Sequence, residues 1–448
     1  MKLYQKITLA GVLGLSAMAG TDVALAQDAA PAVSPETKYV FNTLLFLIGG
    51  FLVMFMAAGF AMLEAGLVRS KNVSMQCLKN ISLYSVAGIM FWVCGYSLMY
   101  TGVDGGYIGT FAPYSFDAVG GGDDAAKAAL IETGYSTASD WFFQMVFVAA
   151  TASIVSGTLA ERIKLWPFLI FTAILTGILY PITGSWKWGA GWLDAMGFQD
   201  FAGSTIVHSV GGWAALTGAL ILGARAGKYS GGKVNPIPGS NIPLATLGTF
   251  ILWLGWFGFN GASQLAMGSL GDVSDVSRIF ANTNLAAAGG VVAAIVLTQI
   301  IYKKVDVTMA LNGALAGLVS ITAEPLQPSP ILAIAIGAVG GVIVVLAVPL
   351  LDKLKIDDVV GAIPVHLLAG IWGTLVVPLS NSDASFGTQI IGIAAYGAFT
   401  VIATAILWTI LKVTIGIRVT EEEELAGLDK TEVGVEAYPE FARGGSSI

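Results

Sequence analysis

The chain has 448 residues, of which 55% are hydrophobic and only 11% are charged. Soluble globular chains carry about 25% charged residues, so water cannot be the solvent for most of this surface. The net charge of −7 gives no indication of nucleic-acid binding. The 56 glycines would weaken helices in water, but in a bilayer small residues let helix backbones approach closely. The composition therefore indicates a protein that crosses a lipid bilayer several times.

The N-terminal segment has the pattern of a secretory signal. Two lysines flank an apolar stretch over residues 7–18, which is too short to span a bilayer, and Ala24-Leu25-Ala26 follows. This pattern predicts a cleaved signal peptide over residues 1–26 and an external N-terminal segment over residues 27–38. An uncleaved extra helix is the alternative.

Apolar stretches of about 20 residues then recur, the length that crosses about 30 Å of hydrocarbon. We expect eleven transmembrane helices, since no strand-like alternation competes with them. Their approximate ranges are 40–67, 79–101, 140–160, 165–184, 203–225, 243–264, 280–301, 307–323, 329–351, 359–380 and 388–413. The predicted fold class is an all-α polytopic membrane protein, with a membrane domain over residues 39–413 and a tail over residues 414–448.

The placement of Lys and Arg predicts the orientation, because cytoplasmic loops carry an excess of both. With an external N-terminus, the cytoplasmic loops hold Arg69, Lys71, Arg162, Lys164, Arg225, Lys228, Lys233, Lys303, Lys304, Lys353 and Lys355. The external side holds only Lys38, Lys127, Lys187 and Arg278. Eleven spans then place the acidic tail in the cytoplasm, and we expect a bacterial inner-membrane protein.

A short repeat opens the fifth and the tenth predicted spans. Residues 200–208 and 358–366 both read Asp-x-x-Gly-x-x-x-Val-His. Because five is odd, a second set of five helices runs in the opposite sense to the first. This is an inverted-topology repeat, which places a transport site near the membrane midplane, and the eleventh helix is peripheral to it.

The chain's only two histidines, His208 and His366, lie at equivalent points of this repeat. Eight helical residues would carry each histidine about 12 Å from its aspartate, close to the membrane centre. Ionisable groups at that depth usually line a pathway, and an imidazole can donate on one nitrogen and accept on the other. We interpret the pair as pore-lining, with helix packing as the alternative. Two histidines without a nearby cysteine or carboxylate leave zinc under-coordinated, so we expect neither a metal nor a cofactor.

The two aspartates of the repeat have a structural interpretation first. We expect Asp200 and Asp358 to cap their helices by accepting hydrogen bonds from free backbone N–H groups. Asp200 would lie at the outer surface and Asp358 at the inner one. The charge of Asp200 also favours cations at the outer mouth.

These motifs resemble the ammonium transporter, methylammonium permease and Rhesus family over nearly all of the chain after the signal peptide. They are Ala160-Glu161-Arg162-Ile163, Asp200-Phe-Ala-Gly203 before His208, Gly255-Trp-Phe-Gly-Phe-Asn260, Asp357-Asp358 before His366, and Gly370-Ile-Trp-Gly373. The resemblance implies a protomer of eleven helices, a homotrimer, and one pore through each protomer. The substrate would be ammonium or ammonia, with methylammonium as a further candidate.

The resemblance also implies roles for matched positions. They are His208 and His366 for the paired pore histidines, Phe147 and Phe259 for two stacked phenyl rings that block the outer pore, and Phe143, Trp188 and Ser263 for an outer recruitment site. An aromatic wall attracts a cation through its negative ring faces, and a serine hydroxyl can accept a hydrogen bond from ammonium. Helix packing or an interfacial belt is the alternative for the aromatic residues.

Potassium is the competitor that such a pore must exclude. It needs a ring of oxygens to replace its hydration shell, which phenyl rings and imidazoles do not offer. We therefore expect ammonium to lose its proton and cross as ammonia, while His208 and His366 relay the proton and make transport electrogenic.

The segment from Gly416 to Pro439 resembles the cytoplasmic tail of the family, which in bacteria supports docking of a PII-type signal protein. Where many relatives have Glu-His-Gly, this chain has Glu432-Val433-Gly434. The run Glu421–Glu424 is alternatively a solvated acidic stretch.

Two other functions stay open at this point. The first is an ammonium sensor that signals through a partner; such proteins commonly carry an appended signalling domain, whereas the predicted tail has about 35 residues. The second is a passive channel for ammonia or carbon dioxide, against which the Trp188 and Ser263 matches argue. An enzyme is disfavoured, because the sequence contains no nucleophile, metal-cluster or cofactor motif.

Overall fold

The computed structural model describes residues 33–116 and 123–439. The predicted signal peptide, and residues 27–32 of the predicted external segment, lie outside these ranges. The regular structure of the described residues is helical, apart from one isolated antiparallel bridge between Ile163 and Arg418. The predicted all-α fold is therefore confirmed.

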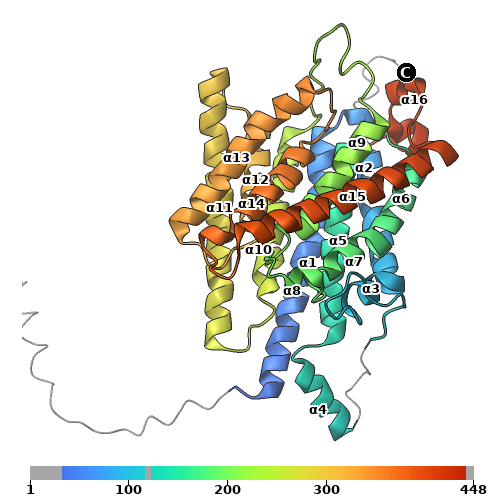
Figure 1. Ribbon diagram of the computed structural model, residues 1–448. Coiled ribbons are helices and arrows are strands. Elements are labelled where there is room, and N and C mark those ends of the chain that lie inside the picture. The colour runs from blue at the N-terminus through green and yellow to red at the C-terminus, as the bar shows by residue number, and fades with distance from the viewer. Residues whose placement is uncertain (1–32, 117–122, 440–448) are drawn as a thin grey trace, which may run out of the picture. The chain divides into compact units, whose positions relative to one another are not determined.

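The helices range from single turns to rods long enough to cross a bilayer (Figure 1). The α-helices are α1 (Pro35–Leu67), α2 (Val73–Met90), α3 (Tyr96–Tyr100), α4 (Asp124–Thr133), α5 (Thr137–Thr158), α6 (Leu165–Ile174), α7 (Tyr180–Ser185), α8 (Trp192–Ala195), α9 (Val210–Leu222), α10 (Ile242–Gly261), α11 (Leu270–Tyr302), α12 (Val307–Ile321), α13 (Pro330–Lys353), α14 (Ala369–Leu375), α15 (Phe386–Thr414) and α16 (Glu421–Ala426). Shorter π-helical or 3₁₀ segments are Ser70–Asn72, Phe91–Gly95, Leu175–Leu179, Ser204–Ser209, Ala262–Gln264, Ile363–Leu368, Val377–Leu379 and Asp429–Val433.

Each of the eleven predicted spans has a helical counterpart in the described part of the chain. Nine stretches are long and apolar enough to cross a membrane, and two shorter apolar helices, Val307–Ile321 and Ile363–Leu379, stand at the eighth and tenth positions. The eleventh span, α15, is the long helix that runs obliquely across the others in Figure 1 and packs against α9 and α14.

Several predicted starts are wrong. The second span begins at Ser70 instead of residue 79, and the first begins at Pro35, inside the segment predicted to be external. Polar residues at the start of this span are buried: the Gln76 amide, before the predicted start, donates to the Asn72 carbonyl, and the Lys79 ammonium, at the predicted start, donates to the Ser156 carbonyl. Because this part of the helix faces protein instead of lipid, its polar residues find partners and the helix continues through them.

Glycines allow the long helices to pack backbone against backbone. In the pairing of α1 with α10, a Cβ added at Gly248 would collide with the backbone of Leu63, and one added at Gly66 with the backbone of Ala245. Small residues at helix crossings are how membrane helices associate without a hydrophobic driving force. The composition predicted that the many glycines serve helix packing. At the α1–α10 contact they have this role.

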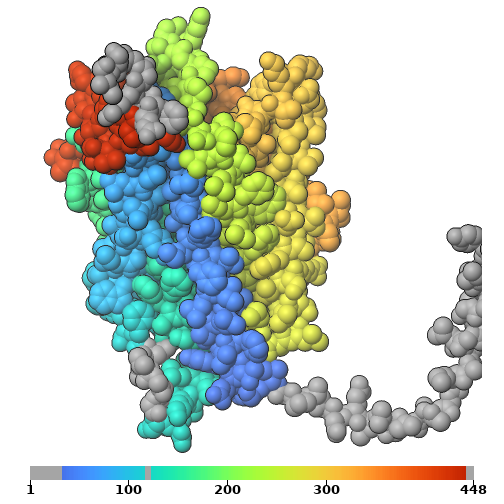
Figure 2. All heavy atoms as spheres, turned by 180° about the vertical axis from the view of Figure 1, so that it is seen from behind, coloured from blue at the N-terminus to red at the C-terminus, as the bar shows by residue number. Residues whose placement is uncertain are grey.

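The tail is docked against one end of the membrane domain, which we call the tail side; it lies at the top of Figure 1. Figure 2 shows the tail (red) against the first helices (blue). The Asn72 side chain accepts from the backbone N–H of Leu428, and the Asp429 carboxylate accepts from the backbone N–H of Met75. Glu424 is buried and pairs with Arg418 at 2.7 Å, so the alternative of a uniformly solvated acidic run is wrong at this residue.

A buried ionic cluster lies beneath the tail, in the turn that follows α5. Glu161, in a left-handed backbone conformation with φ 70°, accepts from the Arg69 guanidinium at 2.6 Å and pairs with Arg225 at 3.4 Å. Arg225 also donates to both carboxylate oxygens of Asp357, at 2.8 and 2.9 Å. Arg162 donates to the Asp357 backbone carbonyl at 2.7 Å. The cluster ties four loops together at the tail side, those that follow α1, α5, α9 and α13.

This cluster predicts acid sensitivity. Burial by itself would raise the pKa of Asp357, but the hydrogen bonds of Arg225 and the charges of Arg162 and Arg225 outweigh burial and hold the pKa well below its usual range. The pKa of Glu161 is lowered in the same way: the charges of Arg225 and Arg69 outweigh its burial. A lowered folded-state pKa contributes stability that is present above the unfolded value, about 4, and is lost as pH falls through the folded value.

We expect Asp357→Asn to lower the stability at pH 7 by about 3 kcal/mol, because it removes the closer of the two carboxylates that pair with the buried Arg225 guanidinium and leaves only Glu161. The variant should also lose less further stability than the wild type between about pH 5 and pH 3. Thermal unfolding of the purified protein across this pH range measures both effects. Parallel pH profiles for the two proteins would contradict the assignment.

Candidate functional site

Two short helical segments bring the histidines together inside the bundle. The segment Ser204–Ser209, which leads into α9, carries His208, and Ile363–Leu368, which leads into α14, carries His366. The two Nδ1 atoms lie 3.1 Å apart, and the ring planes differ by 21°. Both side chains are buried, with exposed fractions of 1% and 3%. At this distance one Nδ1 donates and the other accepts, so the contact holds a single proton between two rings.

The path from aspartate to histidine is not the regular helix that the sequence predicts. The chain turns first at Gly203 and Gly361, whose φ values are 109° and 81°, and the helical segments begin only after these glycines. A side chain at either position would be strained, because a Cβ disfavours the left-handed region. The predicted continuous helix from aspartate to histidine is therefore wrong, although each histidine is buried within the protein.

The repeat aspartates hold these turns. Asp200 accepts four backbone hydrogen bonds, from Gly203 and Ser204 to Oδ1 and from Thr205 and Ile206 to Oδ2, at 2.8 to 3.0 Å. These four N–H groups are the ones that a helix start leaves without partners. Asp200 is itself only 1% exposed.

Asp358 caps the second segment less completely. Its Oδ2 accepts from the backbone N–H of Ile363 at 2.7 Å, and its Oδ1 accepts from the Thr158 hydroxyl at 3.0 Å. It thus joins the segment that carries His366 to the end of α5. The two aspartates share a sequence position in the repeat but differ in how many hydrogen bonds depend on them.

Glycines four residues after each histidine let the two segments cross. A Cβ added at Gly212 would lie 2.6 Å from the backbone nitrogen of Leu367, and one at Gly370 would lie 2.5 Å from the backbone oxygen of Ser204. Gly212 therefore packs beside His366, and Gly370 packs beside the segment that carries His208. The repeat extends in this way to Asp-x-x-Gly-x-x-x-Val-His-x-x-x-Gly.

We expect Gly212→Val to separate the histidines and to destabilise the protein by about 1 to 3 kcal/mol or more, since neighbouring backbone cannot yield to the new side chain. The melting temperature of the purified protein and its ammonium-dependent current report the two effects. Gly88→Ala is a matched control, because its added methyl would meet only Met145, at 3.7 Å or more. Equal losses in the two variants would contradict the crossing argument.

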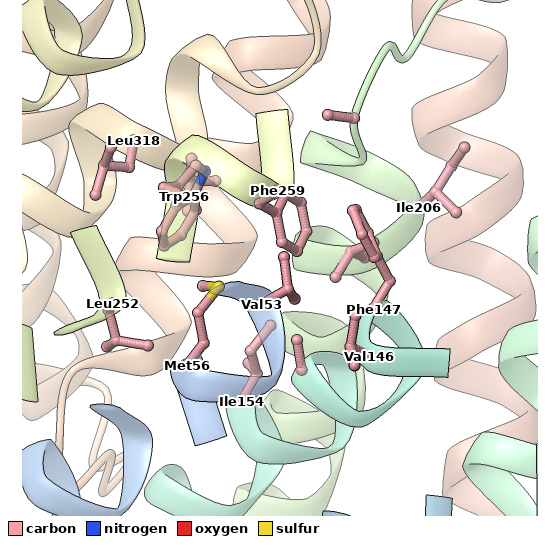
Figure 3. Packing of buried hydrophobic residues seen from close by; sticks show 14 of the residues in the cluster. Val53, Met56, Val146, Phe147, Ile154, Ile206, Leu252, Trp256, Phe259 and Leu318 are labelled. Atoms are coloured by element: carbon pink, nitrogen blue, oxygen red, sulfur yellow. The ribbon is translucent and has the colours of Figure 1, made fainter. Parts of the chain in front are cut away.

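A column of buried aromatic rings continues from the histidine pair toward the side opposite the tail. The rings of Phe147 and Phe259 lie 4.0 Å apart between centroids, at 30°, and Phe259 stacks on His208 at 5.2 Å. Figure 3 shows Phe147 and Phe259 facing one another, with Trp256 beside them. All three residues are at most 1% exposed. The rings close this path to any hydrated ion.

Two aromatic rings that contact the histidine pair are absent from the sequence predictions. Trp256 stacks on His208 at 5.0 Å and 16°, and Phe60 of α1 contacts the ring of His366 at 6.3 Å. Trp256 lies three residues before Phe259, so helical periodicity places both on one face of α10 and was a usable signal. Phe60 carries no such signal, because it comes from a helix without a recognised motif.

The residues of the predicted recruitment site lie around the far end of the column. Phe143 is buried behind Phe147, with ring centroids 4.8 Å apart. Trp188 is half-buried; it meets Phe147 edge-on at 6.0 Å and donates to the Asp200 carbonyl at 3.0 Å. Ser263 is half-buried, and its hydroxyl donates to the Phe259 carbonyl at 2.7 Å. The Ser263 oxygen therefore retains its acceptor lone pairs.

The chemical groups of the site are of kinds that interact with a small cation and with a proton. Within residues 33–116 and 123–439, no group of three or more His, Cys, Asp or Glu side chains could hold a metal ion. Its polar atoms are two imidazoles and one hydroxyl, among aromatic rings. These groups suit a ligand that donates hydrogen bonds and can give up a proton.

Comparison with known proteins agrees with this geometry. Residues 44–438 match the Ammonium Transporter Family. The chain is 41% identical over 425 residues to a putative ammonium transporter of Synechocystis, covering 92% of this chain and 94% of the relative. It is 40% identical over 466 residues to the ammonium transporter Amt2 of Archaeoglobus fulgidus, covering 96% and 94%.

Solved structures give the same result. A chain described as a sensor Amt protein superimposes with a TM-score of 0.82 at 34% identity, covering 89% of this chain and all of that one. The crystal structure of Mep2 from Candida albicans superimposes with a TM-score of 0.76 at 27% identity, covering 90% and 91%.

Proposed function

The chain belongs to the ammonium transporter family, whose members are transporters and not enzymes, and from this premise we propose that it takes up ammonium across a bacterial inner membrane. The observation that carries the proposal is the buried contact of 3.1 Å between His208 and His366 at the end of a closed aromatic column. The family predicted from the sequence motifs is confirmed; the mechanism is our proposal.

Ammonium is first recruited at the end of the column away from the tail. Trp188 and the rings of Phe143 and Phe147 offer negative faces, each worth about 0.5 to 2 kcal/mol to a cation depending on hydration. The Ser263 oxygen accepts one hydrogen bond from the ligand. A cation held there loses part of its water, which prepares it to give up a proton.

The proton and the ammonia then cross separately. Phe147 and Phe259 form a gate of apolar rings that ammonia, being small and neutral, can pass when the rings move. The proton passes through the contact between His208 and His366, where each imidazole accepts on one nitrogen and donates on the other. Potassium has no proton to lose and finds no ring of oxygens, so the route discriminates against it.

The orientation and assembly extend the proposal. We place the tail side in the cytoplasm, because Lys and Arg collect in the loops there. The homotrimer in the proposal rests on the resemblance. The paired helices α1 and α10 expose an apolar surface of the kind that faces either lipid or a neighbouring subunit; its residues include Val40, Phe41, Leu44, Leu47, Ile48, Phe51, Met54, Phe55, Leu247, Phe250 and Leu254.

A PII-type signal protein is the partner proposed for the tail side. The docked tail forms one wall of a cavity there, lined by Asp429, Glu436 and Tyr438 from the tail and by Lys71 and Asn241 from the membrane domain. Because the tail forms part of this surface, the affinity of a protein that binds there depends on whether the tail is docked. Co-purification with a PII-type protein, lost on removal of the tail, tests the partner.

Signalling is a second candidate function, favoured by one observation. A solved sensor Amt protein superimposes on this chain with a TM-score of 0.82 at 34% identity. In that case ammonium binding would change the tail-side surface without substantial flux.

Current measurements on proteoliposomes separate the two functions. A rapid rise in external ammonium should produce a fast inward charge movement, whereas an equal rise in potassium should produce none, and empty liposomes should respond to neither. A correctly folded protein that binds ammonium without any current would overturn the transport proposal and support signalling.

A further inference from the structure

A second ionisable group lies inside the bundle close to the histidine pair. Glu64 of α1 is 1% exposed and stands one helical turn after Phe60, whose ring contacts His366. Its Oε2 accepts from the Ser156 hydroxyl at 2.8 Å. Its Oε1 is buried and has no hydrogen-bond partner in the described part of the chain.

The nearest cation leaves this oxygen open. Lys79 of α2 is completely buried, and its charge acts on Glu64. However, its ammonium donates to the Ser156 carbonyl at 2.8 Å and forms no ion pair with Glu64 among the described residues. A buried carboxylate oxygen without a partner is costly, so this atom is where a proton or a hydrogen-bond donor gains most by binding.

Glu64 and His366 line the same cavity. Phe60, Ser153, Asn312 and Val360 complete much of its wall. Since Nδ1 of His366 faces His208, the second ring nitrogen, Nε2, is the one left to pass a proton onward. The cavity therefore joins the tail-side end of the histidine pair to a carboxylate that can hold a proton.

We propose that Glu64 is the group that returns the proton to ammonia after the histidine pair. The inference rests on the proposed function. His366, protonated on both nitrogens, gives a proton to the Glu64 carboxylate, which leaves a neutral imidazole and a carboxylic acid. The acid then gives this proton to an ammonia molecule in the cavity, which forms ammonium and restores the carboxylate. One ammonium is consumed and one is formed, and one positive charge crosses.

The position in α10 that corresponds to Glu64 holds no proton acceptor of this kind. Trp256 stacks on His208 as Phe60 contacts His366, and the residue four positions after Trp256 is Asn260. Its amide nitrogen donates to the Thr283 hydroxyl at 3.0 Å. An amide does not take up a proton at physiological pH, so the tail-side end differs chemically from the opposite end.

The groups that face Glu64 define its charge environment. The titratable ones are Lys79 and Cys77 from α2, whose electrostatic interactions include Glu64, and His366 across the cavity. Helix α5 adds Ser156, and α2 adds the amide of Asn80, which also interacts with Glu64; Asn312 of α12 lines the same cavity.

The test compares Glu64→Gln with Glu64→Asp in ammonium-jump currents on proteoliposomes. Glutamine preserves the shape and the Ser156 contact but cannot carry the proton, so we expect the charge movement to fall at least about tenfold. Aspartate should restore a large part of it. Any residual current in Glu64→Gln should lose the wild-type dependence on the pH of the tail-side compartment. Glu324→Gln, which changes a buried carboxylate bonded to Asn381, is the matched control and should retain the current.

The outcomes separate this inference from the proposed function. A wild-type current that persists unchanged in Glu64→Gln, with the same pH profile, overturns the role of Glu64 and leaves ammonium transport standing. A wild type without any ammonium current overturns the proposed function itself.

Infrared difference spectra provide a second measurement that does not require the glutamine variant to fold. Ammonium should change a carboxylic-acid C=O band in the wild type, and this band should shift in Glu64→Asp. A band that is absent from the wild type, or that does not move in the aspartate variant, contradicts the proposal.

Discussion

Replacing both His208 and His366 with alanine is expected to abolish selective ammonium transport. The contact of 3.1 Å between the rings is the only hydrogen bond that either side chain makes among the described residues. General acid–base groups contribute about 100-fold or more to proton-transfer rates, so the ammonium current should fall by at least that factor or lose its preference over potassium. Ammonium and potassium jumps on the same proteoliposomes measure both quantities.

A buried ring outside the column provides the control. Trp408 of α15 stacks on Phe171 at 3.8 Å, and Trp408→Phe removes ring volume from a packed position without touching the histidines. This variant should keep both the current and the selectivity of the wild type. Selective ammonium current that persists in the double alanine variant would show that the histidines do not relay the proton.

Asp200→Ala is expected to cause the largest loss of stability of any single substitution considered. It removes the acceptor of four backbone hydrogen bonds at a buried helix start. Each unsatisfied buried donor costs about 1 to 3 kcal/mol, more where the lost partner was charged, so the total should exceed about 4 kcal/mol. The yield of folded protein and its melting temperature measure the loss.

Substitutions of two other aspartates provide comparisons for the loss of stability in Asp200→Ala. Asp358→Ala removes one backbone bond and one hydroxyl bond and should cost less than Asp200→Ala. The side chain of Asp194 is 40% exposed and pairs with Lys187, and Asp194→Ala should cost at most about 1 kcal/mol. Equal melting temperatures for the Asp200 and Asp194 variants would exclude the capping argument.

The tail and the histidine pair are physically connected. Glu424 of the tail accepts from the backbone N–H of Ala226 at 2.7 Å, and the neighbouring Arg225 binds Asp357. Asp358 follows directly and caps the segment that carries His366. Hydrogen bonds and one ion pair therefore link the tail, through two loops, to the segment that carries His366.

Much of the fold follows from the sequence alone. Hydropathy and length located a helix for every predicted span, because a bilayer permits only helices or closed barrels and the apolar stretches have helical length. Starts such as Ser70 were missed because hydropathy assumes that a polar residue avoids the membrane. Whether a polar residue such as Gln76 finds a partner depends on the neighbouring helix, which composition does not describe.

For the site, the sequence identified the two histidines and their aspartates, because a nine-residue repeat around the only two histidines is a local pattern. It could not reveal that Phe60 and Glu64 lie beside His366, since they belong to a helix about 300 residues earlier in the chain. Nor could it determine the turns at Gly203 and Gly361. There the chain leaves the regular helix, and an aspartate carboxylate accepts hydrogen bonds from the backbone N–H groups that follow. The sequence by itself identified His208 and His366 as side chains that can carry a proton inside the membrane. Only the packing of distant helices decided which residues share a cavity, because burial and proximity are properties of the assembled bundle.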